Sequence, residues 1–149
     1  MKNLKINLYI KTKNKKKIPK KKKIIKWIKN IIKKNTTINI CIVNKKQMKI
    51  QNLKYRGIKK TTNILSFPYQ PIKQIKTSLI GDLIICKNTI QKEAKIQKKP
   101  INMHWAHIII HGTLHLIGYH HYYPKQRKIM EEIEIQTMMK IGYKNPYII

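Results

Sequence analysis

Residues His111 to His121 read His-Gly-Thr-Leu-His-Leu-Ile-Gly-Tyr-His-His, and the rest of the chain is best interpreted outward from this stretch. His111 and His115 are four residues apart, so on a helix their side chains lie one above the other on the same face. Gly118 favours the left-handed backbone conformation that closes a helix and lets the chain reverse. That reversal would bring His121 back as a third ligand. Three imidazoles with a fourth position open are typical of a catalytic zinc-type site.

Other interpretations of this stretch stay open. The histidines could be buried polar residues of a core helix, although three at this spacing favour a metal. A closed structural site would need a fourth protein ligand, which His120 could supply. The same spacing of three histidines and a glycine also occurs in zinc peptidases, which carry a glutamate directly after the first histidine as general base. Gly112 stands at that position, and this disfavours peptide hydrolysis.

Apolar patterning on both sides of the histidines predicts strands alternating with helices, and therefore an α/β domain. The predicted strands are Leu4 to Ile10, Thr36 to Asn44, Ile64 to Tyr69 and Leu79 to Cys86. The predicted helices are 20–34, about 45–53, 87–98, one that starts near Ile101, and about 124–141. Pro68 limits its strand to an edge of the sheet or to a strand end. In the last helix we expect these residues to face the core: Ile129, Met130, Ile133, Met138 and Met139.

Length and composition predict one intracellular domain with polyanionic partners. Residues 1–149 contain no internal repeat and no linker, so we expect a single domain. The net charge is +29, from 34 basic and 5 acidic residues, which favours nucleic acid or an anionic membrane surface. All but two of the basic residues are lysines, and the accompanying abundance of Ile and Asn reflects A/T-rich codons, so the charge alone does not establish RNA binding. No apolar stretch is long enough for a signal peptide or a membrane span, and we expect a soluble cytoplasmic protein.

The rare residue types give two further predictions. The carboxylates are Asp82, Glu93, Glu131, Glu132 and Glu134, and no pair of them forms a motif for two-carboxylate or two-metal chemistry. Asp82 stands in an otherwise apolar strand, which suggests a positioned role. Arg56 is one of two arginines, and its planar fork suits bidentate contact with a phosphate. An ordinary surface cation is the alternative for Arg56.

The histidine stretch resembles the signature of the YbeY family of endoribonucleases, His-Gly-x-Leu-His-Leu-x-Gly-Tyr-Asp-His. The resemblance extends from about residue 50 to residue 147. It includes Tyr55-Arg56-Gly57, Asn63-Ile64-Leu65-Ser66-Phe67-Pro68, the run from Ile80 to Cys86 around Gly81-Asp82, His104-Trp105-Ala106-His107 and the tail from Gly142 to Tyr147. The first 45 residues share only the expected pattern of elements.

The resemblance implies a small α/β domain with one mixed four-stranded sheet flanked by helices, and a metal site on a central helix and the turn after it. It implies one metal ion, usually zinc, bound by His111, His115 and His121. It also implies single-strand-specific RNA cleavage in late 3′-end maturation of 16S ribosomal RNA and in ribosome quality control. Arg56, His111 and His115 would be the catalytic residues, with Arg56 acting on the RNA phosphate. Ribosomal proteins and a ribosome-assembly GTPase are the expected partners.

The chain departs from the family pattern at three places. His120 replaces the aspartate before the last histidine, Asn63 replaces an aspartate, and residues 58–60 lack the usual charges after the Arg-Gly pair. His104 and His107 precede His111 on the same helix, with His104 about 10 Å away at 1.5 Å per residue, so we expect both to support the site or face substrate rather than bind the metal. Two alternative functions remain: a non-enzymatic ribosome-assembly factor with a structural metal, and a metal hydrolase of another substrate.

Overall fold

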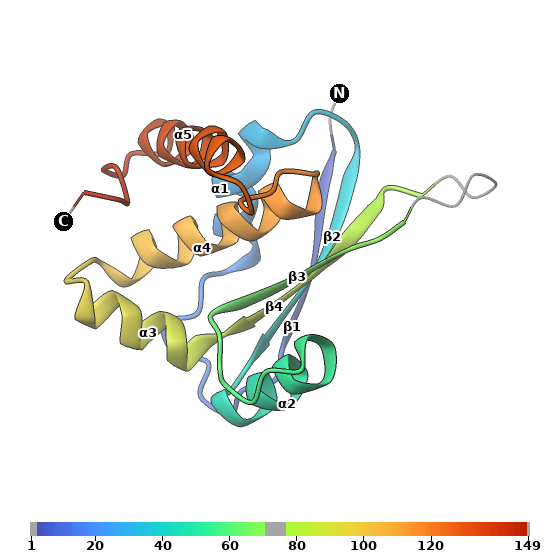
Figure 1. Cartoon of the computed structure of the whole chain (residues 1–149), viewed down its shortest axis with the longest axis vertical. Coiled ribbons are helices and arrows are strands. Elements are labelled where there is room, and N and C mark those ends of the chain that lie inside the picture. Colours follow the sequence, from blue (N-terminus) through green and yellow to red (C-terminus); the bar gives the residue numbers. More distant parts are fainter. Residues whose placement is uncertain (1–2, 71–76, 149) are drawn as a thin grey trace.

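A four-stranded mixed sheet forms the centre of the computed structural model, which describes residues 3–70 and 77–148 (Figure 1). Its strand order is β1-β2-β4-β3. β1 (Leu4–Ile10), β2 (Thr36–Val43) and β4 (Leu79–Cys86) run parallel, and β3 (Ile64–Pro68) pairs antiparallel with β4. Pro68 is therefore in an edge strand, as predicted, where its missing N–H leaves no central ladder bond unmade.

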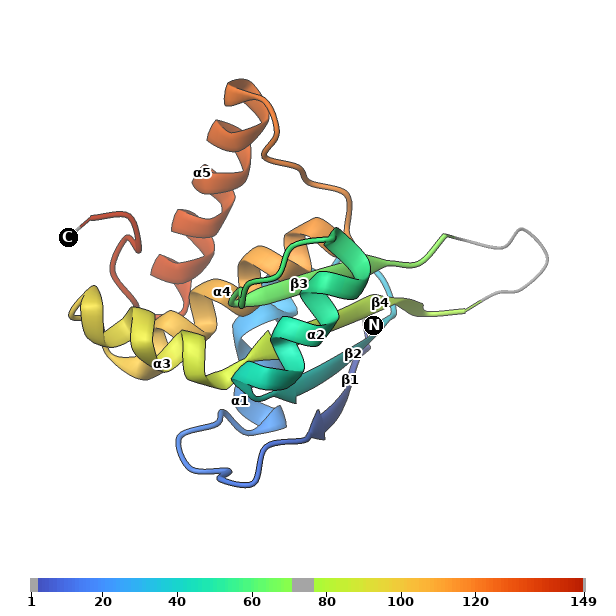
Figure 2. The same ribbon diagram turned by 60° about the horizontal axis from the view of Figure 1, so that its bottom comes forward.

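Helices lie on both faces of this sheet, as is usual where strands run parallel. α1 (Lys21–Ile28) and α4 (Ile101–Leu116) lie on one face, over Ile38, Ile40 and Leu83, all fully buried. α2 (Lys45–Arg56) covers the other face through a small cluster around Met48 and Cys86 (Figure 2). The remaining described helices are the 3-10 turn Lys29–Ile31, α3 (Lys87–Ile96) and α5 (Pro124–Lys140).

α4 is the central helix of the molecule. It is buried along most of its length, and Trp105, Ile109 and Leu114 are fully buried. α1, α3 and α5 pack against it from three sides, and β3 and β4 contact it from the sheet (Figures 1 and 2). A helix enclosed in this way holds its side chains in fixed positions, which suits a metal site.

The predicted elements are confirmed in type and order, with differences at some ends. The first helix stops at Ile28 and continues only as a 3-10 turn. The prediction that Ile129 and Met139 face the core is wrong, because Ile129 is 47% exposed and Met139 is 61% exposed. α5 buries only a narrow stripe, Met130, Glu134, Thr137 and Met138, which matches the i, i+4, i+7, i+8 face of a surface helix. Among the described helices, none is long and apolar enough to cross a bilayer.

Candidate metal centre

Three histidine side chains meet at the carboxyl end of α4, as the sequence predicted. His111 and His115 occupy its last two turns, and Gly118, with φ of +107°, begins the reversal that returns His121. One ring nitrogen from each histidine lies within 4.8 Å of those of the other two. In the described part of the chain, this is the one group of histidine, cysteine and carboxylate side chains arranged to hold a metal ion.

The hydrogen bonds of two of these rings test whether the site fits a metal. Nδ1 of His111 lies 2.6 Å from the Glu134 carboxylate, and Nδ1 of His115 lies 2.9 Å from the carbonyl oxygen of Tyr119. Both partners accept hydrogen bonds, so each Nδ1 donates, and in its neutral form each ring then holds a lone pair on Nε2. Those two Nε2 atoms are 3.1 Å apart. Two lone pairs at that distance need a proton or a cation between them.

A tetrahedral zinc ion would fit this spacing. With Zn–N bonds of about 2.0–2.1 Å, two imidazole nitrogens lie about 3.4 Å apart. Burial and the nearby His111 lower the pKa of His115 to about 4, so this ring is neutral at physiological pH. Burial also lowers the pKa of His121, with help from the charges of His111 and Arg127. Neutral rings are the form that binds metal, and the donor set therefore fits a zinc-type ion.

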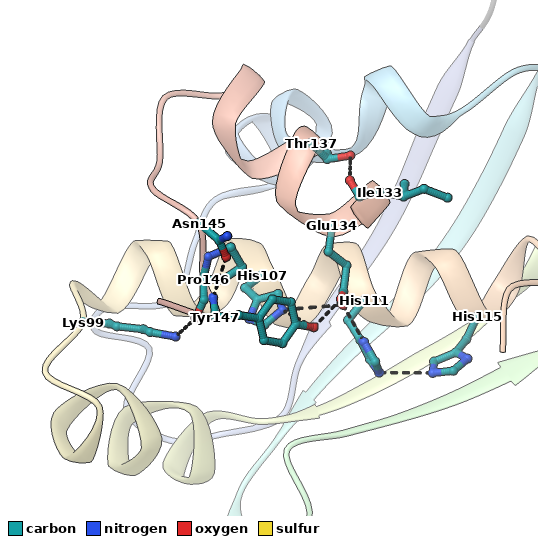
Figure 3. Close-up of polar contacts among 10 residues, drawn as sticks. All are labelled: Lys99, His107, His111, His115, Ile133, Glu134, Thr137, Asn145, Pro146 and Tyr147. Atoms are coloured by element: carbon teal, nitrogen blue, oxygen red, sulfur yellow. Dashed lines mark hydrogen bonds and ion pairs between the residues drawn. The ribbon is translucent and has the colours of Figure 1, made fainter. Parts of the chain in front are cut away.

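Glu134 is the carboxylate that orients the first ligand (Figure 3). It extends from α5 and is completely buried, at 0% exposure. Burial alone would raise its pKa, but hydrogen bonds from His107, His111 and Tyr147 outweigh that effect and lower the pKa to about 2. An ionised carboxylate behind a histidine fixes the ring's tautomer and increases its basicity toward a metal.

The sequence had left Glu134 unassigned, although a signal was present. Glu134 stands between Met130 and Met138 at intervals of four, so it is an acid on the buried face of α5. A buried acid needs a partner, and three donors from α4 and the tail supply it. A pattern of paired carboxylates does not identify Glu134, because orienting a histidine needs only one carboxylate.

The two upstream histidines of α4 are buried and lie outside the ligand cluster, as expected. His107 contacts the Glu134 carboxylate at 3.5 Å and the Tyr147 hydroxyl at 3.3 Å, so it supports the site from behind. His104 is 3% exposed and is held by Glu93 at 2.9 Å. Glu93 belongs to α3, so His104 meets a different carboxylate from the one behind the triad, and its expected role toward substrate or the site stays a prediction.

Gly112 explains why this helix carries no peptidase glutamate. A Cβ atom added there would lie 2.4 Å from Cδ1 of Ile64 and 3.0 Å from Cδ2 of Leu83. The residue after the first histidine therefore faces β3 and β4 rather than the metal site, and a larger side chain would require Ile64 and Leu83 to shift. On the same side, the Ser66 hydroxyl donates a hydrogen bond to the Gly112 carbonyl at 3.3 Å.

A cavity of about 350 Å³ opens beside the triad. It is lined by His111, His121, Arg127, Met130, Glu131, Glu134 and Tyr147. Arg127, from the first turn of α5, thus supplies a guanidinium that the sequence-based reasoning had not placed in the site. Arg56 is the exposed last residue of α2 and is not among the lining residues described for this cavity.

Comparison with known proteins shows the family of this chain. The family model for endoribonuclease YbeY matches residues 9–142. The proteins named endoribonuclease YbeY from two Buchnera aphidicola strains are 47% and 50% identical. The first alignment covers 100% of this chain and 98% of the relative, and the second covers 91% and 87%. The chain belongs to the YbeY family.

A solved structure shows the same fold. The solution structure of TM1509 from Thermotoga maritima has a TM-score of 0.64 and covers 91% of this chain and 88% of its own, with 23% sequence identity. The mixed four-stranded sheet flanked by helices, expected from the YbeY resemblance, is therefore confirmed.

The structure shows the surroundings of two residues that depart from the YbeY pattern, His120 and Asn63. His120 is exposed, and its ring centre lies 6.5 Å from that of His115, outside the ligand group. Asn63 donates a hydrogen bond from its amide to Glu93 at 3.1 Å, a contact that an ionised aspartate could not make.

Asp82, expected to have a positioned role, accepts hydrogen bonds from Asn39 at 3.0 Å and from the hydroxyl of the Tyr69 side chain at 2.7 Å.

Proposed function

We propose that this YbeY protein is a single-strand-specific, metal-dependent endoribonuclease. We place it in the cytoplasm, in late 3′-end maturation of 16S ribosomal RNA and in ribosome quality control. The relatives' printed name, endoribonuclease YbeY, supports RNA cleavage. The observation that carries the metal dependence is the 3.1 Å approach of two Nε2 atoms whose rings are both fixed as donors at Nδ1.

His111, His115 and His121 would hold one ion, proposed to be zinc. When bound, it would activate a water molecule or polarise a phosphoryl oxygen. The protein's part is to fix the ligands: Glu134 orients His111, and the Tyr119 carbonyl orients His115. We propose that Glu131, which lines the same cavity, accepts a proton from the attacking group.

The cations around the cavity would bind the RNA. Arg127 lines the cavity, so its guanidinium can meet the phosphate that undergoes cleavage. Arg56 remains a proposed second phosphate contact. The many lysines that give the chain its net charge of +29 would contact the RNA backbone, and such contacts do not depend on the RNA sequence. Ribosomal proteins and a ribosome-assembly GTPase are the proposed partners.

The test is cleavage of a labelled single-stranded RNA, with the same sequence as a duplex for comparison. The purified protein is assayed as isolated, after removal of metal by chelator, and after zinc is added back. We expect cleavage of the single strand only, loss of cleavage with chelator, and recovery with zinc. His115→Ala should cleave no RNA while binding it with nearly unchanged affinity.

His120→Ala is the matched control, because it removes a neighbouring histidine that lies outside the ligand group. It should retain both metal and cleavage. Cleavage that survives chelator and His115→Ala would overturn the metal-dependent mechanism. Bound metal without any cleavage would instead favour the non-enzymatic assembly factor.

A further inference from the structure

The C-terminal tail, residues 142–147, folds back onto the metal centre. Gly142 ends α5 with φ of +95°, and the backbone N–H of Tyr143 donates to the Met138 carbonyl at 2.9 Å. The Lys99 ammonium donates to the carbonyl oxygen of Pro146, whose side chain is buried (Figure 3). These contacts fix the tail between α3, α4 and α5, and they bring Tyr147 to the buried carboxylate behind the ligands.

Tyr147 and His111 occupy different oxygens of that carboxylate. Oε1 of Glu134 accepts from His111 at 2.6 Å, and Oε2 accepts from the Tyr147 hydroxyl. With 0% exposure, Glu134 has no solvent to replace a lost donor. Without the hydroxyl, Oε2 would be a buried acceptor with neither a hydrogen bond nor water to replace it. The carboxylate would then be free to turn away from His111.

We propose that Tyr147 is a positioning residue of the metal centre, so that docking of the tail and binding of the metal ion stabilise each other. The tail holds Glu134, Glu134 holds the His111 ring, and the ring presents Nε2 to the ion. This inference rests on the proposed metal site and does not depend on RNA cleavage.

Tail docking and metal binding must stabilise each other equally, so the coupling can also be measured at the tail. If the docked tail raises metal affinity by a given factor, bound metal must raise the stability of tail docking by the same factor. A tyrosine that only packs against the surface would not produce this effect. Metal binding would then leave hydrogen exchange in the tail unchanged.

The first measurement is zinc affinity, by competition with a chromophoric chelator, for the full chain and three variants. Tyr147→Phe removes only the hydroxyl, and the ring is already 44% exposed, so the core stays filled. We expect its zinc affinity to fall about tenfold, the lower end of effects for groups behind a metal ligand. Tyr9→Phe is the control, because it removes a hydroxyl from an exposed tyrosine on β1. Its zinc affinity should equal that of the unaltered protein.

Asn145→Ala provides an independent route to the same result. Its side chain accepts the Tyr147 backbone N–H at 2.8 Å, so the variant loosens the tail without altering Glu134 or a histidine. We expect a smaller loss of zinc affinity in the same direction. Circular dichroism of each variant would verify that the fold is intact.

The second measurement is amide hydrogen exchange of the segment 142–148, with and without zinc. Zinc should slow exchange there in the unaltered protein and in Tyr9→Phe, and this protection should be reduced in Tyr147→Phe. Equal zinc affinities for the unaltered protein and Tyr147→Phe would overturn the inference and leave the proposed function standing. If the unaltered protein binds no zinc, both are overturned.

Discussion

Two carboxylate–histidine pairs lie along α4, and only one of them serves the metal centre. Glu93 meets His104 at 2.9 Å near the start of the helix, and Glu134 meets His111 at 2.6 Å near its end. Each carboxylate has a further donor: Asn63 for Glu93 and Tyr147 for Glu134. The pairs are chemically alike.

The difference lies at the second nitrogen of each histidine. Nε2 of His111 faces Nε2 of His115, whereas Nδ1 of His104 is buried and has no hydrogen-bond partner among the residues that the structure describes. A carboxylate behind a histidine therefore does not by itself indicate a metal site. The convergence of a second and third imidazole on the free nitrogen does.

The largest expected effect is on stability, measured by urea unfolding with chelator present. Glu134→Ala should cost about 3–5 kcal/mol, because it leaves the buried donors of His107, His111 and Tyr147 without their charged acceptor. Glu93→Ala should cost about 1 kcal/mol, since the Glu93 side chain is 31% exposed and solvent can replace it. Equal losses for the two variants would contradict the ranking of the two pairs.

Zinc affinity should differ more clearly than stability between variants of the Glu134–His111 pair and the Glu93–His104 pair. Glu134→Gln keeps the shape but removes the charge behind His111, and zinc affinity should fall about 10–100-fold. Glu93→Gln makes the same change at the other pair and should leave zinc affinity unaltered. Isothermal titration of both variants tests this, and a matching loss in Glu93→Gln would mean that α4 transmits the effect along its length.

Substitution of each arginine tests whether the reacting phosphate lies near Arg127 in the cavity or near Arg56 at the end of α2. Arg127→Ala removes the guanidinium from the cavity and should lower the cleavage rate about tenfold, equivalent to ~1.4 kcal/mol of transition-state stabilisation. Zinc affinity should not fall, because the Arg127 guanidinium disfavours positive charge at His121 and its removal favours a bound cation. Arg56→Ala should have the smaller effect on cleavage, and the reverse order would place the reacting phosphate nearer the end of α2.

Most of the fold could be predicted from the sequence because its signals are local. Alternating leucines and isoleucines mark β1, alternating isoleucines mark β2, and Asn44 with Gln47 forms the capping box that starts α2. The ligand spacing is also local, since His111 and His115 share one helix face and Gly118 reverses the chain. These features need no knowledge of tertiary contacts.

The supporting residues could not be predicted because they come from distant segments. Glu134 and Tyr147 lie 23 and 36 residues beyond His111 along the chain, and only the packing of α5 and the tail brings them behind it. Arg127 enters the cavity for the same reason. The exposure of Ile129 and Met139 likewise depends on which narrow face of α5 meets α4 and α1.

The stability of the fold should depend on the ionisation of Glu93 at acidic pH. Burial would raise the pKa of Glu93, but hydrogen bonds from His104 and Asn63 outweigh it, so the pKa in the fold lies below the ordinary value of 4.5. The folded state then binds fewer protons than the unfolded one, and Glu93 contributes stability above pH 4.5 that is lost as the pH falls through its lowered pKa. Thermal unfolding of Glu93→Gln should depend less on pH in this acidic window. An unchanged pH dependence would contradict the assignment.

The smallest expected effect belongs to His120. Because it lies outside the ligand group, His120→Asp, which restores the family residue, should leave zinc stoichiometry at the value of the unaltered protein. Elemental analysis of both proteins after dialysis tests this. A lower zinc content in the variant would make His120 a fourth ligand and the site a closed, structural one.

The most direct test of the central claim is a zinc titration of the metal-free protein in which bound zinc and single-stranded RNA cleavage are followed in the same samples. If His111, His115 and His121 form the catalytic site, cleavage should rise in proportion to bound zinc and stop rising at one ion per chain. Full cleavage before any zinc is bound, or none at one ion per chain, would contradict it.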